Sequence, residues 1–262
     1  MQPAANPGER NSAPTPIQRV REWVSSARHL AVLTGAGMSA ESGVPTFRDA
    51  QTGLWAQFRP EELATEDAFR AHPQRVWDWY QFRRELIAAV EPNAGHRAIA
   101  AFQRRHPGRL ALITQNVDGL HQRAGSTDAL ALHGNIFEDR WLGECALARR
   151  PQEVCDTASA QAGRPPRCAE CGNLLRPGVV WFGEMLPVAV LDAAEQASRS
   201  CELMLVVGTS GVVYPAAGLA RLARDAGARV VVLNPEPTGL DALAHAVLRG
   251  RAAELLPPLL EN

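Results

Sequence analysis

Lysine is absent from the 262-residue chain, so all 27 basic residues are arginine. The protein therefore cannot form a lysine Schiff base, and it lacks the lysine of a Walker-type nucleotide site. Long apolar runs are absent too, since none reaches the roughly 18 residues of a membrane span. Residues 1–14 are polar and rich in proline, alanine and asparagine, without the apolar core of a signal peptide. We expect them to form a disordered tail.

The net charge limits the kinds of partner to be expected, and the cysteines indicate the cellular compartment. The formal net charge is −1, which favours neither nucleic acid nor an anionic membrane as a partner, so a charged ligand must be bound by local groups. Five cysteines are present, four of them between positions 145 and 171. This clustering favours a metal site in a reducing compartment over a disulfide framework. We predict a cytoplasmic protein, with a monomer as the default.

Short apolar segments predict an α/β fold with a Rossmann-like open parallel sheet. A helix capped by Thr15 should begin at Pro16 and lead into a strand that ends before Gly35. Further buried strands are expected at 110–114, 203–207 and 230–233, because these runs are short and rich in leucine and valine. A helix from Pro215 to Gly227 should join the last two strands.

Two segments interrupt this pattern. Residues 50–91 are aromatic-rich and helical in character, and residues 135–177 hold the cysteines and little regular pattern. We predict one domain over residues 15–262, with its core formed by 15–49, 92–134 and 178–262. The two interrupting segments should form a smaller module, part helical and part similar to a zinc ribbon.

A glycine turn directly after the first strand indicates a nucleotide site. Gly35 and Gly37 lack Cβ atoms, so the backbone can turn sharply and bring main-chain N–H groups close to a pyrophosphate. A hydride-transferring Rossmann enzyme would continue with a helix, a second strand and an acidic residue about 20 residues on. Here Pro45 disfavours a continuing helix, and Phe47 and Arg48 supply a ring and a guanidinium. We predict a loop that covers a cofactor.

Polar side chains also follow the other predicted strands, and each group alone is a weak signal. Asn116 and Asp118 can hold a ribose or a carboxamide, but they can equally cap the next helix. His133 ends an apolar run and can act as a base near neutral pH, although a histidine in this position is more often structural. The remaining strand-end residues, suited to phosphate, ribose or adenosine, are Gln115, Gly208, Thr209, Ser210, Asn234, Pro235 and Glu236.

In their order along the chain, these motifs resemble those of the sirtuins, the NAD-dependent protein deacylases. The similarity runs from about residue 17 to 256 and includes GAGMSAESG and TFR within 35–48, TQNVDGLH at 114–121, LHGN at 132–135, VVWFGE at 179–184 and GTS at 208–210. It implies NAD as a co-substrate and an acyl-lysine protein as the partner. The substrate carbonyl oxygen would attack the ribose carbon that carries nicotinamide, nicotinamide would leave, and O-acyl-ADP-ribose and free lysine would result.

The resemblance also assigns roles to residues of this chain. His133 would be the base that activates a ribose hydroxyl, and Asn116 would act with it, lining the nicotinamide pocket together with Asp118. Val180, Phe182 and Gly183 would lie in a strand over 179–184 that pairs with the substrate backbone. The cofactor would be contacted by Gly35, Ala36, Gly37, Ser39, Ala40, Thr46, Phe47, Arg48, Gln115, Asn116, Asp118, Gly208, Thr209, Ser210, Asn234, Pro235, Glu236 and Ala252.

Tyr80 and Arg83 bear on which acyl group is removed. They are three residues apart and share a helix face, where a phenol and a guanidinium can bind a carboxylate. Taken alone, the pair could be a core tyrosine beside a solvated arginine. It resembles the Tyr-x-x-Arg pair of the bacterial-type, class III sirtuins that remove acidic acyl groups. We therefore predict desuccinylation and demalonylation over deacetylation.

The cysteines depart from the sirtuin pattern. Cys168 and Cys171 have the spacing of a zinc knuckle. The first pair is irregular, because Trp141 stands where its first member is expected and the candidates that remain, Cys145 and Cys155, are ten residues apart. A four-cysteine structural zinc site and an incomplete or empty site both remain open.

Two other classes of protein would share some of these features. A Rossmann oxidoreductase with structural zinc would explain the glycine turn and the cysteines, but the acidic residue after a second strand is missing. A non-catalytic sensor of NAD or ADP-ribose would bind without releasing nicotinamide, whereas His133 favours turnover. ADP-ribosyl transfer to a protein uses the same leaving group and stays open as a side activity.

Overall fold

The structure, a computed structural model, describes residues 14–45, 60–147, 155–156 and 160–261. The tail predicted for residues 1–14 lies almost wholly outside them. Six strands form one open parallel sheet in the order β10-β9-β8-β1-β2-β3. Their bounds are Leu30–Thr34 (β1), Leu110–Thr114 (β2), Leu130–Ala131 (β3), Leu203–Val207 (β8), Arg229–Leu233 (β9) and Ala246–Leu248 (β10).

The sheet is buried on both faces, which explains its composition. Every residue of β1 and β8 is buried, and such strands form from continuous leucine and valine runs without polar alternation. The predicted α/β class with an open parallel sheet is confirmed. From β1 the chain adds β2 and β3 on one side, whereas β8, β9 and β10 extend the sheet on the other. The carboxyl ends of β1 and β8 therefore mark the topological switch point, where ligands of open α/β sheets bind.

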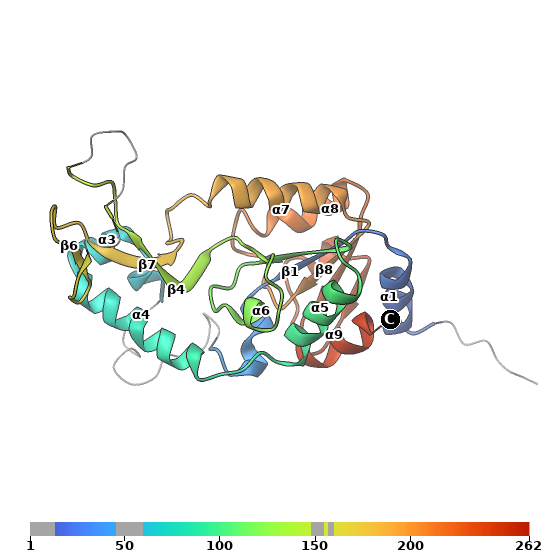
Figure 1. The fold of residues 1–262 in the computed structure, drawn as a ribbon. Coiled ribbons are helices and arrows are strands. Elements are labelled where there is room, and N and C mark those ends of the chain that lie inside the picture. Colours follow the sequence, from blue (N-terminus) through green and yellow to red (C-terminus); the bar gives the residue numbers. More distant parts are fainter. Residues whose placement is uncertain (1–13, 46–59, 148–154, 157–159, 262) are drawn as a thin grey trace, which may run out of the picture.

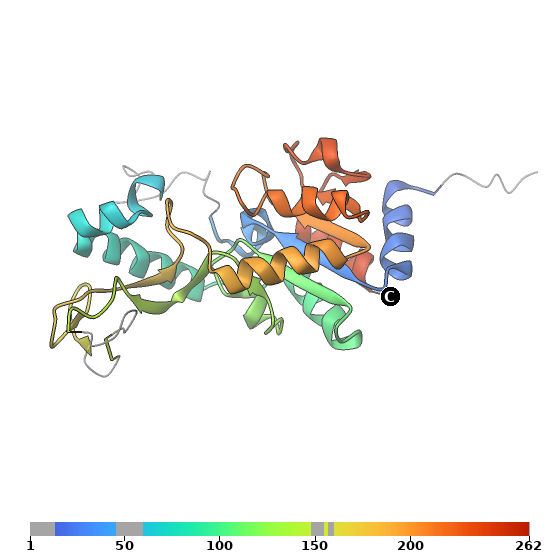
Figure 2. The same cartoon turned by 90° about the horizontal axis from the view of Figure 1, so that it is seen from above.

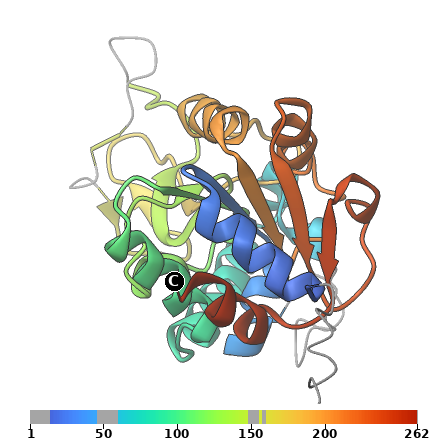
Figure 3. The ribbon, with the colours of Figure 1, turned by 90° about the vertical axis from the view of Figure 1, so that its right-hand side faces the viewer.

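Helices cover both faces of the sheet (Figures 1 and 3). On one face lie α1 (Pro16–Ser26), α5 (Ala94–Arg105) and α9 (Ala252–Leu260), whose apolar residues share a core with the sheet. On the other face lie α7 (Val188–Ser200) and α8 (Gly218–Asp225). None of the helices in the described ranges is long and apolar enough to cross a membrane.

The predicted helix starts are right for one helix and wrong for another. Thr15 caps α1, and its side chain accepts a hydrogen bond from the Gln18 N–H, as the sequence indicated. The last helix of the predicted βαβ unit begins at Gly218 rather than at Pro215. The reason is local: Gly218 N–H donates to the Pro215 carbonyl and Leu219 N–H to the Ala216 carbonyl, so this stretch is a tighter turn with bonds to the third preceding residue.

A second group of elements lies at the far end of the molecule from α1 (Figures 1 and 2). Its helices are α2 (Pro60–Leu63), α3 (Glu66–Ala71) and α4 (Pro73–Ala88), and its strands are β4 (Gly134–Trp141), β5 (Ala160–Gln161), β6 (Arg167–Cys168) and β7 (Leu175–Val179). A largely aromatic core joins α3 and α4 to β4, β7 and the residues after β7, and it includes Phe69, Trp79, Tyr80, Ile136, Val179 and Trp181. The strand β4 was not foreseen, because only Ile136 and Trp141 of its eight residues are buried and they do not alternate.

The strand expected over residues 179–184 is wrong beyond its first residue. β7 ends at Val179, and the chain then turns, with the Glu184 N–H donating to the Trp181 carbonyl at 3.0 Å. The Glu184 carboxylate accepts from the Trp181 N–H at 2.8 Å, and Gly183 adopts a left-handed φ of 88°. This side-chain bond competes with an extended strand, so a turn forms.

Gly134 is the residue that lets β4 and β7 pair directly after His133. A Cβ atom at Gly134 would lie 2.1 Å from the Gly178 carbonyl oxygen, and its φ is +79°. Side-chain-bearing residues meet both a backbone clash and left-handed strain at such a position.

We therefore predict that Gly134→Ala destabilises the fold by about 2 kcal/mol or more. In a chain of this size that corresponds to a fall in Tm of roughly 4–8 °C, which calorimetry would measure. Gly143→Ala is the matched control, because a Cβ there meets nothing within 4 Å and its φ is ordinary. Equal Tm values for the two variants would contradict the assignment.

Candidate active site

The site begins at the contact between the loops that follow β1 and β8. Gly37 N–H donates to the Gly208 carbonyl at 2.8 Å, and Gly35 N–H donates to the Val207 carbonyl at 3.0 Å. Cβ atoms would lie 2.7 Å from Thr209 Cβ at Gly35, and 2.8 Å from Gly208 Cα at Gly37. The two backbones touch at the switch point, which only glycine allows.

This contact gives the predicted glycine turn a different reason from the one the sequence suggested. We expected Gly35 and Gly37 to free their N–H groups for a pyrophosphate. Both N–H groups are instead bonded to the end of β8 and the residue after it. Those of Met38 and Ser39 are bonded within their own turn, to the Gly35 and Ala36 carbonyls. The glycines thus hold two strand ends together, and any ligand here must be bound by other groups of the two loops.

Ser39 organises the polar side chains behind this turn. Its hydroxyl donates to Asp118 Oδ2 at 2.7 Å and accepts from Asn116 Nδ2 at 3.1 Å. The N-cap of α6 (Leu120–Arg123) is Gly119, and Asp118, one residue earlier, accepts the Leu120 N–H through Oδ1 at 2.9 Å. Burial raises the pKa of Asp118, and the Ser39 hydrogen bond opposes that shift. Asp118 is therefore not the N-cap of this helix, although it bonds the first N–H of α6 as well as Ser39.

Two buried histidines lie beneath these residues, and sequence reasoning gave them no role. His96 Nε2 lies 3.4 Å from the Ser39 hydroxyl, and His121 Nε2 lies 3.0 Å from Thr34 Oγ1. Burial lowers the pKa of His96 to about 4 and that of His121 to about 3, so both rings are neutral near pH 7. Their ring centroids are 4.7 Å apart. His121 lies within the motif at 114–121, whereas His96 lies in α5, outside the motifs.

The hydrogen bonds of Ser39 and Asn93 determine the tautomer of His96. Because Ser39 gives its proton to Asp118, His96 can bond to Ser39 only as an Nε2–H donor, and its Nδ1 accepts from the Asn93 N–H at 3.3 Å. Thr34 in turn donates to Thr114 Oγ1 at 2.8 Å, and that oxygen also accepts the Asn116 N–H at 3.0 Å. Asn116 is thus held by its side chain and by its backbone.

His133 is held by Gln115, the first residue after β2. Its Nδ1 lies 2.8 Å from the Gln115 carbonyl oxygen, which can only accept, so Nδ1 carries the proton and Nε2 keeps its lone pair. Burial lowers the pKa of His133, and this bond partly offsets the shift. Gln115 also reaches the other loop, with Nε2 donating to Thr209 Oγ1 at 3.1 Å.

The remaining predicted cofactor residues are placed less tightly. Asn234 lies directly after β9 and donates its side-chain N–H to the Glu236 carbonyl at 2.7 Å, which shapes its own loop. Ala252 begins α9 and is buried, and its carbonyl lies beside Gly95. Ala36 and Ser210 are half-buried on the two loops, and Ala40 is exposed. Thr46, Phe47 and Arg48 lie outside the described residues.

Tyr80 and Arg83 share one face of α4, as predicted. The Arg83 guanidinium carbon lies 5.8 Å from the Tyr80 ring centroid and 4.9 Å from that of Trp79. Burial lowers the pKa of Arg83, and the negative charges of an ionised Tyr80 and of the Asp118 carboxylate oppose the shift. Arg83 thus packs against aromatic rings of α4 and feels the charge of Asp118 in the Ser39 network. Tyr80 is not free, because its hydroxyl accepts from Trp181 Nε1 at 3.0 Å.

In the segment over 179–184, which was expected to pair with a substrate, two backbone N–H groups already bond to other parts of the chain. Val180 N–H donates to the His133 carbonyl and Phe182 N–H to the Ala64 carbonyl, each at 2.9 Å. Phe182 is nevertheless 47% exposed, and Gly183 beside it is exposed as well.

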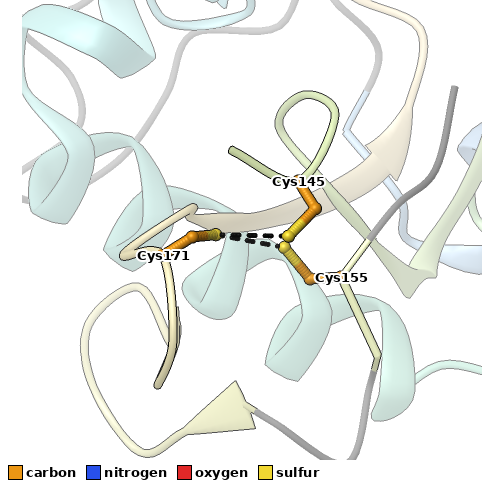
Figure 4. Close-up of side chains that lie close together, drawn as sticks. All are labelled: Cys145, Cys155 and Cys171. Carbon is orange, nitrogen blue, oxygen red and sulfur yellow. Dashed lines mark hydrogen bonds between the residues drawn. The ribbon is translucent and has the colours of Figure 1, made fainter. Parts of the chain in front are cut away.

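Three of the four predicted metal ligands, Cys145, Cys155 and Cys171, point toward one another despite their irregular spacing (Figure 4). Cys171 Sγ lies 3.8 Å from that of Cys145 and 3.4 Å from that of Cys155. Cys168 belongs to the same cluster, which also includes Trp141. Backbone N–H groups of Asn173 and Ala146 lower the pKa of the Cys171 thiol to about 6, which favours the thiolate that metals bind.

This cluster fits zinc. Tetrahedral Zn–S bonds of about 2.3 Å separate two sulfurs by roughly 3.8 Å, close to the two separations above. Three thiols lie within 4.8 Å of one another in the described part of the chain. The site is remote from the switch point, next to β6 and β7, so a zinc ion there would stabilise the module and take no part in chemistry.

This geometry is that of a nucleotide-binding α/β protein whose switch point carries a network of polar side chains and a histidine of lowered pKa. The Sir2 family profile matches residues 35–215, and the chain belongs to that family, the sirtuins.

Relatives and solved structures agree with this assignment. An "NAD-dependent protein deacylase" of Ralstonia nicotianae is 58% identical over 250 residues, covering 95% of this chain and 98% of that protein. A crystal structure of a Sir2 homologue–NAD complex aligns with a TM-score of 0.79 at 41% identity, over 93% of this chain and 92% of the other. A mutant Sir2 homologue with 2′-O-acetyl ADP ribose aligns at 0.80 and 43% identity, over 93% and 95%.

We predict that protein purified without added zinc contains close to one zinc ion per chain by elemental analysis. Cys171→Ser should lower both the zinc content and the Tm, because it removes a sulfur that lies near two others. Cys201→Ala is the matched control, since Cys201 is a buried cysteine outside the cluster. A chain that is free of zinc and as stable with Ser at position 171 would contradict the site.

Proposed function

We propose that this protein is an NAD-dependent protein-lysine deacylase that prefers succinyl and malonyl groups over acetyl. The observation that carries the proposal is His133, whose proton is fixed on Nδ1 by Gln115 at the end of β2. That leaves a basic Nε2 on a ring bonded to Gln115, the sequence neighbour of Asn116, which belongs to the polar network of Ser39, Asn116 and Asp118. The names of the relatives and their ligands support the choice of NAD and of an acylated protein.

The pocket residues suit the first step. When bound, NAD supplies a ribose carbon that can lose nicotinamide and accept the acyl oxygen. Asn116 is oriented by bonds to Ser39 and Thr114, so we place it at the nicotinamide end with Asp118. Gln115 and Thr209, bonded to each other across the two loops, lie where the ribose and phosphates would run. Preorganised polar groups of this kind stabilise developing charge without reorganising.

His133 suits the second step. A neutral imidazole with a free Nε2 can take the proton of a ribose hydroxyl, whose oxygen then attacks the acyl carbon. The lysine nitrogen would leave as the protonated amine, and one water molecule would add to the acyl carbon to give O-acyl-ADP-ribose. Because the pKa of His133 is lowered, this neutral form persists below the usual range of histidine. The base therefore stays competent through the neutral range and is lost only as the pH falls through the lowered pKa.

The substrate peptide would lie beside the turn after β7. Val180 and Phe182 have already committed their N–H groups, so we propose that the substrate backbone pairs with the remaining backbone groups of this segment, Gly183 included. Exposed apolar side chains border the segment and the loop before α8: Phe182, Met185, Val212, Val213 and Tyr214.

The acyl preference rests on Tyr80 and Arg83. Arg83 is half-buried and interacts electrostatically with Asp118, and we propose that its charge serves the acyl end of the site. A succinyl or malonyl carboxylate would gain a charge-assisted hydrogen bond there, whereas an acetyl group would gain none.

We expect His133→Ala to lower kcat by about 10²- to 10⁴-fold, because a positioned base contributes that much. Mass spectrometry of an acylated peptide incubated with NAD would detect O-acyl-ADP-ribose in the wild type alone. The acid limb of the wild-type kcat profile should lie below pH 6.5, the unperturbed value.

His106→Ala provides the control for that experiment, since this histidine caps α5 at the opposite end from Asn93. Turnover retained by His133→Ala, or reduced nicotinamide formed by the wild type, would refute the proposed function. The latter product would indicate hydride transfer instead.

Arg83→Met should lower the ratio of desuccinylation to deacetylation by roughly 10- to 100-fold, the range expected for losing a hydrogen bond to a charged group. The ratio is measured as kcat/KM on one peptide sequence carrying either acyl group. Arg75→Met, a change on the same helix but at an exposed position, serves as the control. An unchanged ratio for Arg83→Met would show the acyl assignment to be wrong.

A further inference from the structure

We propose that Trp181 is a positioning residue for acyl selectivity: its indole N–H holds the Tyr80 hydroxyl so that the phenol proton is presented to an acidic acyl group. This inference rests on the proposed function. Trp181 was not among the predicted site residues, because the sequence showed it only as one apolar residue within VVWFGE.

The hydrogen bond between Trp181 and Tyr80 runs from the indole N–H to the phenol oxygen. An indole nitrogen can only donate, so at 3.0 Å the Tyr80 oxygen is the acceptor. The hydroxyl proton of Tyr80 takes no part in this bond and remains available to a second acceptor. A tyrosine whose oxygen accepts one bond is also a better donor for the next, because neighbouring hydrogen bonds polarise one another.

Trp181 cannot easily move. The Arg176 guanidinium carbon lies 3.3 Å from the centroid of its ring, and the Phe69 ring centroid lies 5.2 Å away. The backbone N–H of Trp181 donates to the Glu184 carboxylate at 2.8 Å. The indole is therefore fixed through its ring and through its backbone, and only 2% of the residue is exposed.

Arg176 is itself held in place, which extends the support by one layer. It is buried and pairs with Glu184 through both terminal nitrogens, and Nη2 also donates to the Val179 carbonyl at 2.6 Å. Burial alone would raise the pKa of Glu184, but the hydrogen bonds from Arg176 and from the Trp181 N–H lower it, so the carboxylate stays charged. A rigid chain of contacts thus runs from Glu184 through Arg176 and Trp181 to Tyr80.

Tyr80 is held in its neutral, protonated form. Burial raises its pKa, although the charge of Arg83 opposes the shift. The phenol therefore remains protonated at neutral pH and can donate to a carboxylate that Arg83 also contacts. An acetyl group offers neither partner an anionic oxygen, so the orientation of the Tyr80 proton matters for succinyl and malonyl substrates alone.

The test is Trp181→Phe, which keeps an aromatic ring but deletes the N–H donor. We expect the desuccinylation to deacetylation ratio of kcat/KM to fall by roughly 2- to 10-fold, the effect of losing one neutral hydrogen bond. The loss should appear mainly in the KM of the succinyl peptide. Trp77→Phe makes the same change on the helix that carries Tyr80, away from this contact, and should leave the ratio unchanged.

A double-mutant cycle separates positioning from mere packing. If Trp181 acts through Tyr80, adding Trp181→Phe to Tyr80→Phe should not lower the ratio further. Should Trp181→Phe fail to fold, as its Tm would show, replacing Trp181 with 3-benzothienylalanine keeps the ring shape and removes only the N–H.

The outcomes are distinguishable. An unchanged ratio in both Trp181 variants, or an equal fall with and without Tyr80, would overturn this inference while leaving the Arg83 result and the proposed function intact. A wild-type protein that forms no O-acyl-ADP-ribose from either peptide would overturn the proposed function and this inference together.

Discussion

The site depends on the backbone contact between the loops after β1 and β8. In a parallel sheet, strands that neighbour each other at the switch point diverge into separate connections, and side chains normally keep those connections apart. Here Gly35 and Gly37 on one side and Gly208 on the other remove that barrier, and the N–H of Gly37 bonds to the Gly208 carbonyl. Because a Cβ at Gly208 would lie 2.4 Å from the Met38 nitrogen, alanine cannot replace it without separating the loops.

Everything polar in the pocket is positioned relative to this contact. Ser39 follows the β1 turn and bonds to Asn116 and Asp118, which follow β2. Gln115 bonds to Thr209 in the β8 loop and to His133 after β3. Four connections therefore share one hydrogen-bonded layer at the carboxyl edge of the sheet. Buried networks of this kind are stable only when their members are satisfied, so the glycine contact and the network depend on each other.

The sequence predicted what local pattern determines and missed what distant contacts determine. The strands of the sheet and the polar residues at their ends were recognisable, because each strand is a short apolar run followed by glycine or a polar residue. The histidine pair, His96 and His121, was not, since the two rings meet only in the folded chain. The strand expected over 179–184 fails for a similar reason: the Glu184 carboxylate turns back to the Trp181 N–H and ends it. The cysteine spacing looked irregular along the chain, yet folding brings the sulfurs together.

Arg83, on which the proposed acyl preference rests, would also couple α4 to the polar network. It packs against the rings of Trp79 and Tyr80, and the charge of Asp118 acts on it. Asp118 in turn holds Ser39, and through Ser39 it orients Asn116. A carboxylate bound at Arg83 would neutralise part of the positive charge that now stabilises the Asp118 carboxylate. Asp118 would then depend more on the hydrogen bond from Ser39. Binding of an acidic acyl group at Arg83 would then affect Ser39 and, through it, the orientation of Asn116. An acetyl group, which brings no charge, would have no such effect.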